Sequence, residues 1–589
     1  MKVPTSFSQK VAHVFQKIQS ITLKPLAKCG WFFAFTMLLV YVIAAVGNLM
    51  DAHTDPFLSF LLPIFDCYLV CVIACLLKKI RLHWLWVILV AALLFAELFT
   101  EFFYKTNFTV YVIQLILETD SRESSEFISS ALSHPATWKS LLLTVCTVIV
   151  AYILNRLAHR RFRYRQAVMS VVFGLIVWSG IRQLSAYTKL YRCFTSQSAA
   201  ECLESENYPH MNSPFIRFSY GMAFNTASSA ELEVLEKSVA ATVVDSCSYR
   251  CPFIVLIIGE SYNKHHSQLY GYDLPTTPRL VKHQEEGHLY PFNNVVSPFN
   301  LTSSVFKHMF TTWDDECTDD WTQHTLFTAI FKKAGYKVYF ATNQFVLSSK
   351  SDWDISGGTI FNRPLLSKLQ FTDRNLYSYQ FDDQLLAELP PLDTLTAAPT
   401  LLIFHMLGQH VQYEEKYPAD FARFSAKDEK TPFGGEEGKQ MSAHYDNATY
   451  YNDFVVDSIF RMLKDTEAIA IYLSDHGEEV YDWRDHYERT GEATMLPEVA
   501  HYQYEIPMMF FMTDSFMSRH EDITTMVKTA TGRPFISTDL RHTLLFLAGI
   551  GHADYKEKFN LLSPNYDMHR RRIIRHSIDY DELIKDLKR

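Results

Sequence analysis

The chain has 589 residues, which is enough for two to four domains at about 150 residues each. Charged residues make up 20% of it and aromatic residues 14%, an average that is typical of a chain partly embedded in a membrane and partly globular. The net charge of −9 gives no indication of nucleic-acid binding, so no nucleic-acid partner is expected.

Five long apolar stretches occupy the first 190 residues. Each is close to the roughly 20 residues that an α-helix needs to cross a bilayer, and five in succession are not expected of buried core helices. They predict a five-helix transmembrane domain over residues 1–188. The stretches are Trp31–Met50, Phe57–Leu77, Leu82–Phe103, Leu141–Leu157 and Ala167–Leu184.

The connections between these stretches alternate in charge. Lysine and arginine collect in the N-terminal arm, after the second stretch and after the fourth, whereas the connections after the first and third stretches are acidic. Because cytoplasmic loops carry an excess of Lys and Arg, the N-terminus is expected in the cytoplasm and everything after the fifth span outside. The basic segments are residues 2–28, 78–81 and 155–165, and the acidic ones are residues 51–55 and 105–139.

The cysteines outside the membrane region are expected to meet an oxidising compartment. Two close pairs, Cys193 with Cys202 and Cys247 with Cys251, have the spacing of local disulfides. Cys317 is then left over, and a free buried thiol is an equally good interpretation for it.

From Pro252 onwards, short apolar segments alternate with helical patterns. This alternation predicts an α/β domain over residues 251–589, with a mostly parallel sheet covered by helices on both faces. Residues 189–250 are expected to form a juxtamembrane connector with a helical pattern near 230–237. The predicted strands are Phe253–Ile258, Lys337–Ala341, Thr400–Phe404, Ala468–Leu473 and Met508–Met512, and the predicted helices are Thr325–Ala334, Asp446–Leu463 and Asp539–Leu547.

Polar side chains follow four of the predicted strands at the point where each strand ends. In open α/β sheets, ligands bind outside the carboxyl ends of the strands, so these side chains are expected at one edge. Any one of them alone is better explained as a helix cap or a hydrogen-bonded core residue, but four together favour a site. They lie in Gly259-Glu260-Ser261, Thr342-Asn343-Gln344, His405 with Gly408-Gln409-His410, and Ser474-Asp475-His476-Gly477-Glu478.

Glu260, Asp475 and His476 offer two hard oxygens and one nitrogen. Such a set suits zinc or manganese and leaves a fourth coordination position open. A hydroxyl at the start of the helix predicted from Asn300 would meet the positive end of the helix dipole, and a nearby metal would lower its pKa further. The candidates are Thr302, Ser303 and Ser304, and the alternative is a helix cap without chemistry.

Taken together, these motifs resemble the phosphoethanolamine transferases of Gram-negative inner membranes, whose outer domain is alkaline-phosphatase/sulfatase-like. The resemblance covers nearly the whole chain. It rests on Gly259-Glu260-Ser261, the segment 269–278 (LYGYDLPTTP), Thr302 with Met309-Phe310, Asn343-Gln344, the segment 405–410 (HMLGQH) with Tyr417-Pro418, Ser474-Asp-His-Gly-Glu478, Tyr504-Glu-Ile-Pro507 and the segment 561–566 (LLSPNY).

The resemblance implies a multi-pass protein of a bacterial inner membrane with a periplasmic catalytic domain. It implies that Thr302 is the nucleophile and that Glu260, Asp475 and His476 hold a zinc ion that also contacts the Thr302 oxygen. One tight zinc site is expected, with a second metal or manganese as further options. The donor would be phosphatidylethanolamine, and the intermediate a phosphoethanolamine-threonine.

The same resemblance implies which residues meet the substrates. A further family histidine lies about a dozen residues after the Asp–His pair, and here the histidines nearest to that spacing are ten and twenty-five residues on. The expected substrate-binding residues are His410, Asn343, Gln344, Lys350, His405, His486 and His501.

The acceptor is expected to be lipopolysaccharide, at lipid A or a core sugar, or a periplasmic glycan. The lipid A branch places cysteines four residues before and six residues after the nucleophile, where this chain has Pro298 and His308. The chain therefore resembles more closely the branch that acts on core sugars or periplasmic glucans.

Other functions fit parts of the same pattern. A phosphoglycerol transferase of the lipoteichoic-acid type has the same topology and differs in its donor, and a metal-dependent phosphodiesterase would differ in lacking an acceptor pocket. A sulfatase would need a Cys/Ser-x-Pro-x-Arg motif, which the sequence lacks. A non-enzymatic scaffold would bind no metal and would tolerate replacement of Thr302.

Overall fold

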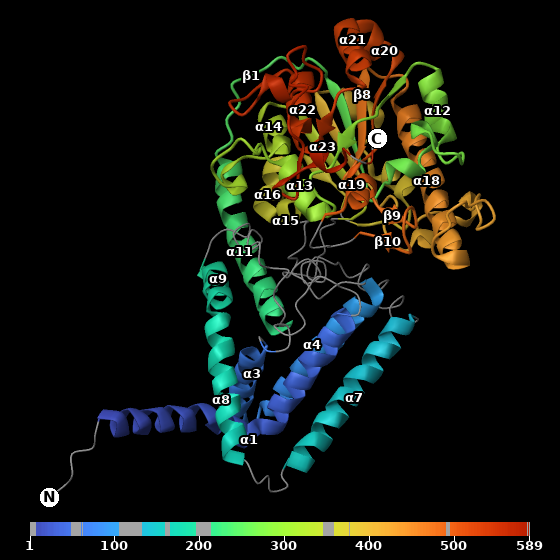
Figure 1. Cartoon of the computed structure of the whole chain (residues 1–589). Coiled ribbons are helices and arrows are strands. Elements are labelled where there is room, and N and C mark those ends of the chain that lie inside the picture. The colour runs from blue at the N-terminus through green and yellow to red at the C-terminus, as the bar shows by residue number, and fades with distance from the viewer. Residues whose placement is uncertain are drawn as a thin grey trace, which may run out of the picture. The chain divides into compact units, whose positions relative to one another are not determined.

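A computed structural model describes residues 7–48, 61, 63–104, 132, 134–158, 165–195, 214–344, 359–375, 377–489, 495–585 and 587. The chain divides into two compact units, one ending at Glu231 and the other beginning at Leu232 (Figure 1). Each unit is described by itself below. Figure 1 labels those helices and strands of both units for which there is room.

The first unit is entirely helical in the part of the chain that the structure describes. Its helices α1 and α4 pack together through buried apolar side chains such as Phe35, Leu39 and Leu94. On the outer surface of α7, Leu142 and Ile149 are exposed, as expected of side chains that face lipid. The helices are α1 (Phe7–Asn48), α3 (Ile64–Lys79), α4 (His83–Tyr104), α7 (Pro135–Ala158), α8 (Arg165–Arg182), α9 (Leu184–Thr195) and the first part of α11 (Pro214–Ala240).

Among the described residues, three helical segments are long and apolar enough to cross a membrane: Gln16–Ile43, His83–Phe102 and Pro135–Leu154. They coincide with the first, third and fourth predicted spans. The second predicted span corresponds to α3, which has 16 residues, and the fifth to the shorter apolar helix Ser170–Arg182. The prediction of apolar membrane helices is therefore confirmed for three, and the count of five stays a prediction.

The second unit is built around a seven-stranded sheet with the order β3-β11-β8-β2-β7-β5-β6. The five strands from β8 to β6 are parallel, whereas β11 runs antiparallel to both β8 and β3, so the sheet is mixed rather than wholly parallel. The five predicted strands are confirmed. The strands are β2 (Phe253–Gly259), β3 (Leu289–Phe292), β5 (Lys337–Thr342), β6 (Asp373–Arg374), β7 (Thr400–His405), β8 (Ala468–Ser474) and β11 (Met508–Met512).

Both faces of the sheet are buried, which explains why its strands read as unbroken apolar runs. Alternate side chains of β2 point to opposite faces, so Leu256 joins one core with α13, α14 and α22, and Ile257 joins another core with α18. The covering helices are α12 (Pro278–Glu285), α13 (Thr302–Phe310), α14 (Phe327–Lys333), α18 (Gly435–Leu463) and α22 (Leu540–Ala548).

The register of the central strands aligns their carboxyl ends. Ile258 of β2 lies opposite His405 of β7, and Gly259 lies opposite Ser474 of β8. On the far side of β7, Thr342 of β5 also lies opposite His405. The polar residues that follow β2, β5, β7 and β8 therefore emerge at one edge of the sheet.

The helix α18 begins eleven residues earlier than the predicted start at Asp446. Its first turns pack against the loop carrying Tyr413 and against β9 (Glu479–Val480) through polar and aromatic residues such as Ser442 and Tyr445. These turns therefore lack the regular spacing of aliphatic residues that would mark a helix in the sequence. The helix near residues 230–237 is confirmed as the end of α11.

The remaining elements are short and lie around the sheet. They are α15 (Thr359–Asn362), α16 (Pro364–Gln370), α17 (Leu392–Thr396), α19 (Pro497–Tyr504), α20 (Asp514–Arg519), α21 (Glu521–Ala530), α23 (Tyr580–Leu583), β1 (Ser246–Cys247), β4 (Val295–Val296), β9 (Glu479–Val480), β10 (Tyr487–Glu488), β12 (Phe535–Ile536), β13 (Ile550–Gly551), β14 (Ile573–Ile574) and β15 (Ile578–Asp579).

The predicted disulfide between Cys247 and Cys251 is wrong, because both are free thiols. Cys247 lies in β1, which pairs with β13, and its Sγ is 3.8 Å from the carbonyl oxygen of Ala548. Cys251 instead points into the core, where burial raises the pKa of its thiol to about 12. The other predicted pair lies partly outside the described residues, since Cys202 does.

Candidate functional site

Glu260 is the first residue after β2 and is completely buried. The next residue, Ser261, has a φ of 54°, and this sharp turn brings its hydroxyl back to donate to Glu260 Oε1 at 2.8 Å. The side chain of Gln344 donates to Glu260 Oε2 at 3.0 Å and to the carbonyl oxygen of Met406 at 2.8 Å. The turn after β2 and the end of β5, which lies on the far side of β7, thus fix the Glu260 carboxylate.

Gly408 supports the backbone of Glu260 from the end of β7. Its φ is +50°, and a Cβ there would lie 2.8 Å from the carbonyl oxygen and 2.9 Å from the nitrogen of Glu260. The backbone of Gln409 donates to the same carbonyl oxygen at 3.1 Å. No side chain fits between these two backbone segments, so glycine is required here.

We therefore expect Gly408→Ala to destabilise the outer domain by about 2–4 kcal/mol, through a backbone clash added to an unfavourable φ. Gly435→Ala is the matched control, because Gly435 has a φ of +59° and no atom within 4 Å of the added Cβ. The control should cost only about 1–2 kcal/mol. Urea unfolding of the two variants measures the difference, and equal losses would contradict the packing argument.

Asp475 and His476 follow β8 and are also completely buried. Asp475 Oδ1 accepts hydrogen bonds from the backbone N–H of Ser261 at 3.1 Å and of His476 at 2.7 Å. Its other oxygen, Oδ2, lies 3.1 Å from Nε2 of His476. One oxygen of Asp475 is therefore used by the backbone and the second faces the histidine.

His476 is held in one tautomer by the backbone. Its Nδ1 lies 2.8 Å from the carbonyl oxygen of Gly477, and because a carbonyl only accepts, Nδ1 carries the hydrogen. Nε2 of the neutral ring then presents a lone pair toward Asp475 Oδ2 at 3.1 Å and Glu260 Oε1 at 3.2 Å. This is the tautomer and backing contact of a metal-ligating histidine.

Thr302 begins α13 and brings a hydroxyl to the same point. Its Oγ1 lies 3.0 Å from Glu260 Oε2 and 3.3 Å from His476 Nε2. The residue before it, Leu301, offers no side-chain cap, so the first N–H groups of the helix point toward this region unshielded by a cap. The positive end of the helix dipole favours negative charge on the Thr302 oxygen.

The charges of this cluster are unbalanced. The ligand atoms of Glu260, Asp475 and His476 lie within 4.8 Å of one another. The two buried carboxylates of Glu260 and Asp475 therefore face the uncharged lone pair of His476 Nε2. Burial, reinforced by the neighbouring Glu260 carboxylate, raises the pKa of Asp475 well above its usual range. A divalent cation among these atoms would relieve the repulsion, and the set of two carboxylates, one imidazole and one hydroxyl suits zinc or manganese.

Sequence reasoning missed Arg489. Its Nη1 lies 3.0 Å from His476 Nε2, and its Nε lies 3.7 Å from the buried carboxylate of Glu478. Arg489 follows the β9–β10 hairpin, and no motif in the sequence marks it; only the fold of the hairpin brings it to the cluster. It adds a fixed positive charge beside the candidate metal ligands.

The two amides predicted to bind substrate are engaged within the protein. Asn343 donates to Asp382 Oδ1 at 2.9 Å and accepts from the backbone of Tyr379 at 2.6 Å, whereas Gln344 holds Glu260 as described above. These contacts are those of positioning residues.

The predicted histidines lie in different surroundings. Burial lowers the pKa of His410 to about 3, so His410 is neutral at physiological pH. The nearby Glu260 carboxylate acts in the opposite direction and raises this pKa. His405 is wholly buried, with its ring 4.7 Å from that of Phe306 and its Nδ1 3.1 Å from Thr342 Oγ1. Both contacts of His405, with Phe306 and with Thr342, are those of a histidine that packs in the core.

The remaining predictions do not converge on the cluster. His486 lies in the β9–β10 hairpin, where its backbone bonds Tyr481 and Arg484. His501 belongs to a separate group with His265 and Glu505. Lys350 lies outside the described residues.

Comparisons with known proteins were made for the whole chain. A protein-family model described as Sulfatase matches residues 252–550, just over half of the chain. Phosphoethanolamine transferase EptC of Escherichia coli O18:K1:H7 (strain RS218 / NMEC) is 27% identical over 479 residues, which cover 79% of this chain and 79% of that protein. Phosphoethanolamine transferase CptA of Salmonella typhimurium (strain LT2) is 27% identical over 476 residues, with the same coverage.

Among solved structures, the integral membrane protein lipooligosaccharide phosphoethanolamine transferase A (EptA) from Neisseria meningitidis matches with a TM-score of 0.56. It is 20% identical and the match covers 90% of this chain and 97% of that chain, so the two share a fold with helical membrane and α/β parts. The matched family segment contains β2, β5, β7 and β8 and the cluster of Glu260, Thr302, Asp475 and His476. The chain therefore belongs to the sulfatase family.

Proposed function

We propose that this chain is a metal-dependent transferase that moves phosphoethanolamine from phosphatidylethanolamine to a lipopolysaccharide or glycan acceptor. The observation that carries the proposal is the position of Thr302 Oγ1, 3.0 Å from Glu260 and 3.3 Å from His476 at the start of α13. Relatives that cover 79% of the chain are named phosphoethanolamine transferases, which favours this donor group over others.

In the first half-reaction, Thr302 Oγ attacks the phosphorus of the donor lipid. The new bond joins Oγ to phosphorus, and the bond from phosphorus to the diacylglycerol oxygen breaks. The hydroxyl hydrogen of Thr302 is directed at Glu260 Oε2, the acceptor nearest to it, and the leaving diacylglycerol takes up a proton. A zinc ion held by Glu260, Asp475, His476 and Thr302 would supply Lewis acidity, with manganese as an alternative.

In the second half-reaction, an acceptor hydroxyl or phosphate attacks the phosphoethanolamine-threonine. The bond from Thr302 Oγ to phosphorus breaks, and Oγ regains a proton. Arg489, whose Nη1 is 3.0 Å from His476 Nε2, and His410 would offer hydrogen bonds to phosphoryl oxygens. Gln344 keeps Glu260 in place throughout, through its 3.0 Å hydrogen bond.

The membrane helices give the proposed enzyme access to a lipid donor. We further propose five spans with a cytoplasmic N-terminus, and a division into a membrane domain (1–188), a connector (189–250) and a periplasmic catalytic domain (251–589). The three apolar helices and the alternation of basic and acidic connections support this arrangement. For the acceptor, core sugars or periplasmic glucans are favoured over lipid A, because Pro298 and His308 stand where the lipid A branch has cysteines.

The test uses the full-length protein in detergent with zinc, headgroup-labelled phosphatidylethanolamine and either purified lipopolysaccharide or a short periplasmic glucan. We expect label on one acceptor, seen as a gain of one phosphoethanolamine mass, and none from phosphatidylglycerol with the same acyl chains. Transfer from phosphatidylglycerol alone would instead indicate a phosphoglycerol transferase. Free phosphoethanolamine with no labelled acceptor would indicate a phosphodiesterase.

A further inference from the structure

The loop between α13 and α14, residues 311–326, is closed at its base and carries an unusual set of side chains. Thr311 and Leu326 form an isolated β-bridge, and the backbone N–H of Thr312 donates to the carbonyl oxygen of Thr325 at 2.8 Å. Between these ends, residues 313–324 read WDDECTDDWTQH. We call residues 311–326 the Cys317 loop.

We propose that Cys317, Asp319 and His324 in this loop form a second metal site, separate from the catalytic cluster, that takes a zinc-like divalent cation. Their ligand atoms lie within 4.8 Å of one another. Tetrahedral zinc, with bonds of about 2.0–2.3 Å, needs ligand separations of about 3.3–3.8 Å, so a small closure of the loop suffices. One thiol, one imidazole and one carboxylate suit zinc better than calcium or magnesium, which prefer oxygen ligands only.

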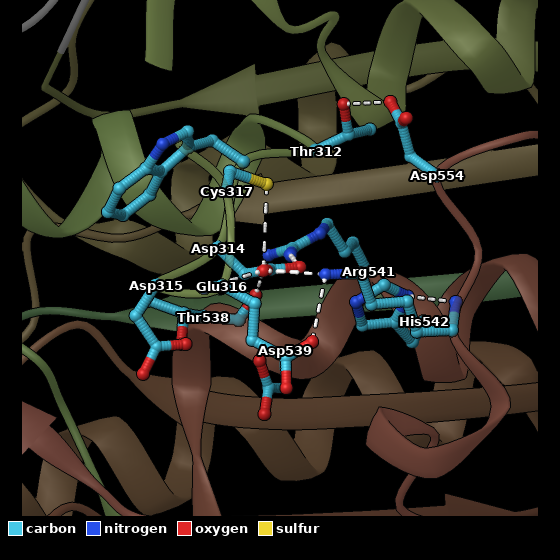
Figure 2. A network of polar contacts seen from close by, with 12 residues as sticks. Thr312, Asp314, Asp315, Glu316, Cys317, Thr538, Asp539, Arg541, His542 and Asp554 are labelled. Carbon is cyan, nitrogen blue, oxygen red and sulfur yellow. Dashed lines mark hydrogen bonds and ion pairs between the residues drawn. The ribbon is translucent and has the colours of Figure 1, made fainter. Parts of the chain in front are cut away.

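The histidine is oriented as a metal ligand needs to be. Nε2 of His324 lies 3.0 Å from Asp319 Oδ1, on the side of the proposed ion, and Nδ1 lies 4.0 Å from Asp554 Oδ2. Thr312 donates to the same Asp554 oxygen at 2.5 Å (Figure 2). At 4.0 Å the Asp554 carboxylate is beyond hydrogen-bond distance of Nδ1, so it acts on the ring only as a nearby negative charge.

The thiol is fixed from the other side by a buried ion network. Figure 2 shows Cys317 directed at Asp314, whose Oδ1 is 3.6 Å from Sγ. Asp314 is held by the wholly buried Arg541 at 3.2 Å and by Lys556 at 2.7 Å. The loop therefore presents Cys317 from a preformed frame, which lowers the ordering cost of binding a cation.

The charges of the loop also favour a cation at this point. Three of its acids already pair with fixed cations: Asp314 with Arg541 and Lys556, Asp315 with Arg570, and Glu316 with Lys556 and Lys558. Asp319 instead faces His324, and its side chain is 48% exposed. A metal ion can therefore reach the Asp319 carboxylate from solvent, and the partner of that carboxylate, His324, is itself one of the proposed ligands.

Another histidine–carboxylate group of this domain, one of two besides the Cys317 loop and the catalytic cluster among the described residues, is less suited to a metal. His265 and His501 face Glu505, but Lys264 and the hydroxyl of Tyr580 already bond the two oxygens of that carboxylate. A cation would have to displace a buried ammonium group there. Among the described residues, the ion pairs of Asp319 and His324 involve no lysine or arginine.

Binding would replace a proton by the metal. Burial raises the pKa of the Cys317 thiol, so the thiol is protonated at neutral pH before the metal arrives. Coordination forms the sulfur–metal bond and releases that proton to solvent. With the metal bound, the Cys317 loop would be held together at its tip by the ion as well as at its base by the β-bridge. This loop directly follows α13, the helix that begins with Thr302.

Cobalt is the probe, because a cobalt–thiolate bond gives a charge-transfer band in the near ultraviolet and the catalytic cluster contains no sulfur. Full-length protein in detergent, stripped of metal and titrated with Co²⁺, should develop this band. Cys317→Ser should remove it, while His324→Ala and Asp319→Ala should weaken cobalt affinity at least roughly tenfold. Cys247→Ser, which removes another partly buried free thiol, and Asp475→Asn, which disables the catalytic cluster, should leave the band unchanged.

A second measurement needs no variant. Zinc should slow alkylation of Cys317 in the wild-type protein at least roughly tenfold, and should leave the alkylation of Cys247 unchanged, with both read from peptide masses. The proposal is overturned if cobalt gives no thiolate band, if the band survives Cys317→Ser, or if zinc does not protect Cys317. Because the readouts follow sulfur coordination, they are independent of any transferase activity.

Discussion

Thr302→Ala is expected to reduce phosphoethanolamine transfer by roughly a thousandfold or more, because it removes the atom that would carry the phosphoryl group. Full-length protein incubated with phosphatidylethanolamine and zinc, without acceptor, should gain one phosphoethanolamine mass in the wild type and none in the variant. The added mass should map to the peptide that contains Thr302. The variant should unfold at nearly the wild-type temperature, since only a partly exposed methyl and hydroxyl are lost.

Ser304→Ala is the matched control for this experiment. Ser304 lies in the same first turn of α13, and its replacement should leave the adduct in place. Thr302→Ser should retain part of the activity, because a hydroxyl remains within reach of Glu260. An adduct that survives in Thr302→Ala would make Ser303 or Ser304 the nucleophile, and the absence of an adduct on any form would argue for direct transfer without a covalent intermediate.

Asp475→Asn is expected to have opposite effects on activity and on the stability of the metal-free protein. Activity should fall by at least roughly a hundredfold, because a charged ligand is lost. The metal-free variant should nevertheless unfold a few degrees above the metal-free wild type. An amide at this position keeps the oxygen that accepts from Ser261 and His476, and its NH₂ can donate to the Glu260 carboxylate or to His476 Nε2.

The pH dependence of this difference follows from the raised pKa of Asp475. A carboxyl whose pKa is higher in the folded than in the unfolded chain destabilises the fold at neutral pH, and this cost disappears as the pH falls toward the unfolded value of about 3.9. The stability gap between the metal-free variant and wild type should therefore narrow between pH 7 and about pH 4.

Zinc at a hundred times its dissociation constant should stabilise the wild type by about 2.7 kcal/mol and the variant much less. Thermal unfolding with and without chelator measures both effects. A metal-free variant that unfolds below the wild type at neutral pH would contradict the charge imbalance inferred for the cluster, and equal zinc stabilisation of both forms would remove Asp475 from the metal site.

Much of the outer domain could be predicted from the sequence because its strands are buried on both faces. Such strands read as short apolar runs, and the runs 253–258, 400–404 and 468–473 coincide with β2, β7 and β8 to within a residue. Parallel strands also place their carboxyl ends at one edge, which is why residues far apart in sequence, such as Glu260 and Asp475, could be expected near each other. Three of the five predicted membrane helices could be confirmed, because helix length and hydropathy are local properties of the sequence.

Contacts that depend on a turn or on the packing of another segment could not be predicted in this way. The two thiols of Cys247 and Cys251 are close in sequence, yet the pairing of β1 with β13 and the burial of Cys251 keep them apart. Gln344 could have faced a substrate, but the fold turns it onto Glu260. The start of α18 was missed because its polar first turns carry no apolar period.

By itself, then, the sequence determined which segments form helices and which form the central strands of the sheet, and which residue types stand at the strand ends. These features follow from the spacing of hydrophobic residues and from short-range chemistry. The tertiary structure alone decided which atoms meet: the lone pair of His476 facing two carboxylates, Arg489 arriving from the β9–β10 hairpin, and Asp554 standing behind His324. These distances depend on strand register and on how loops pack, and they involve segments separated by as many as 230 residues, over which no local pattern acts.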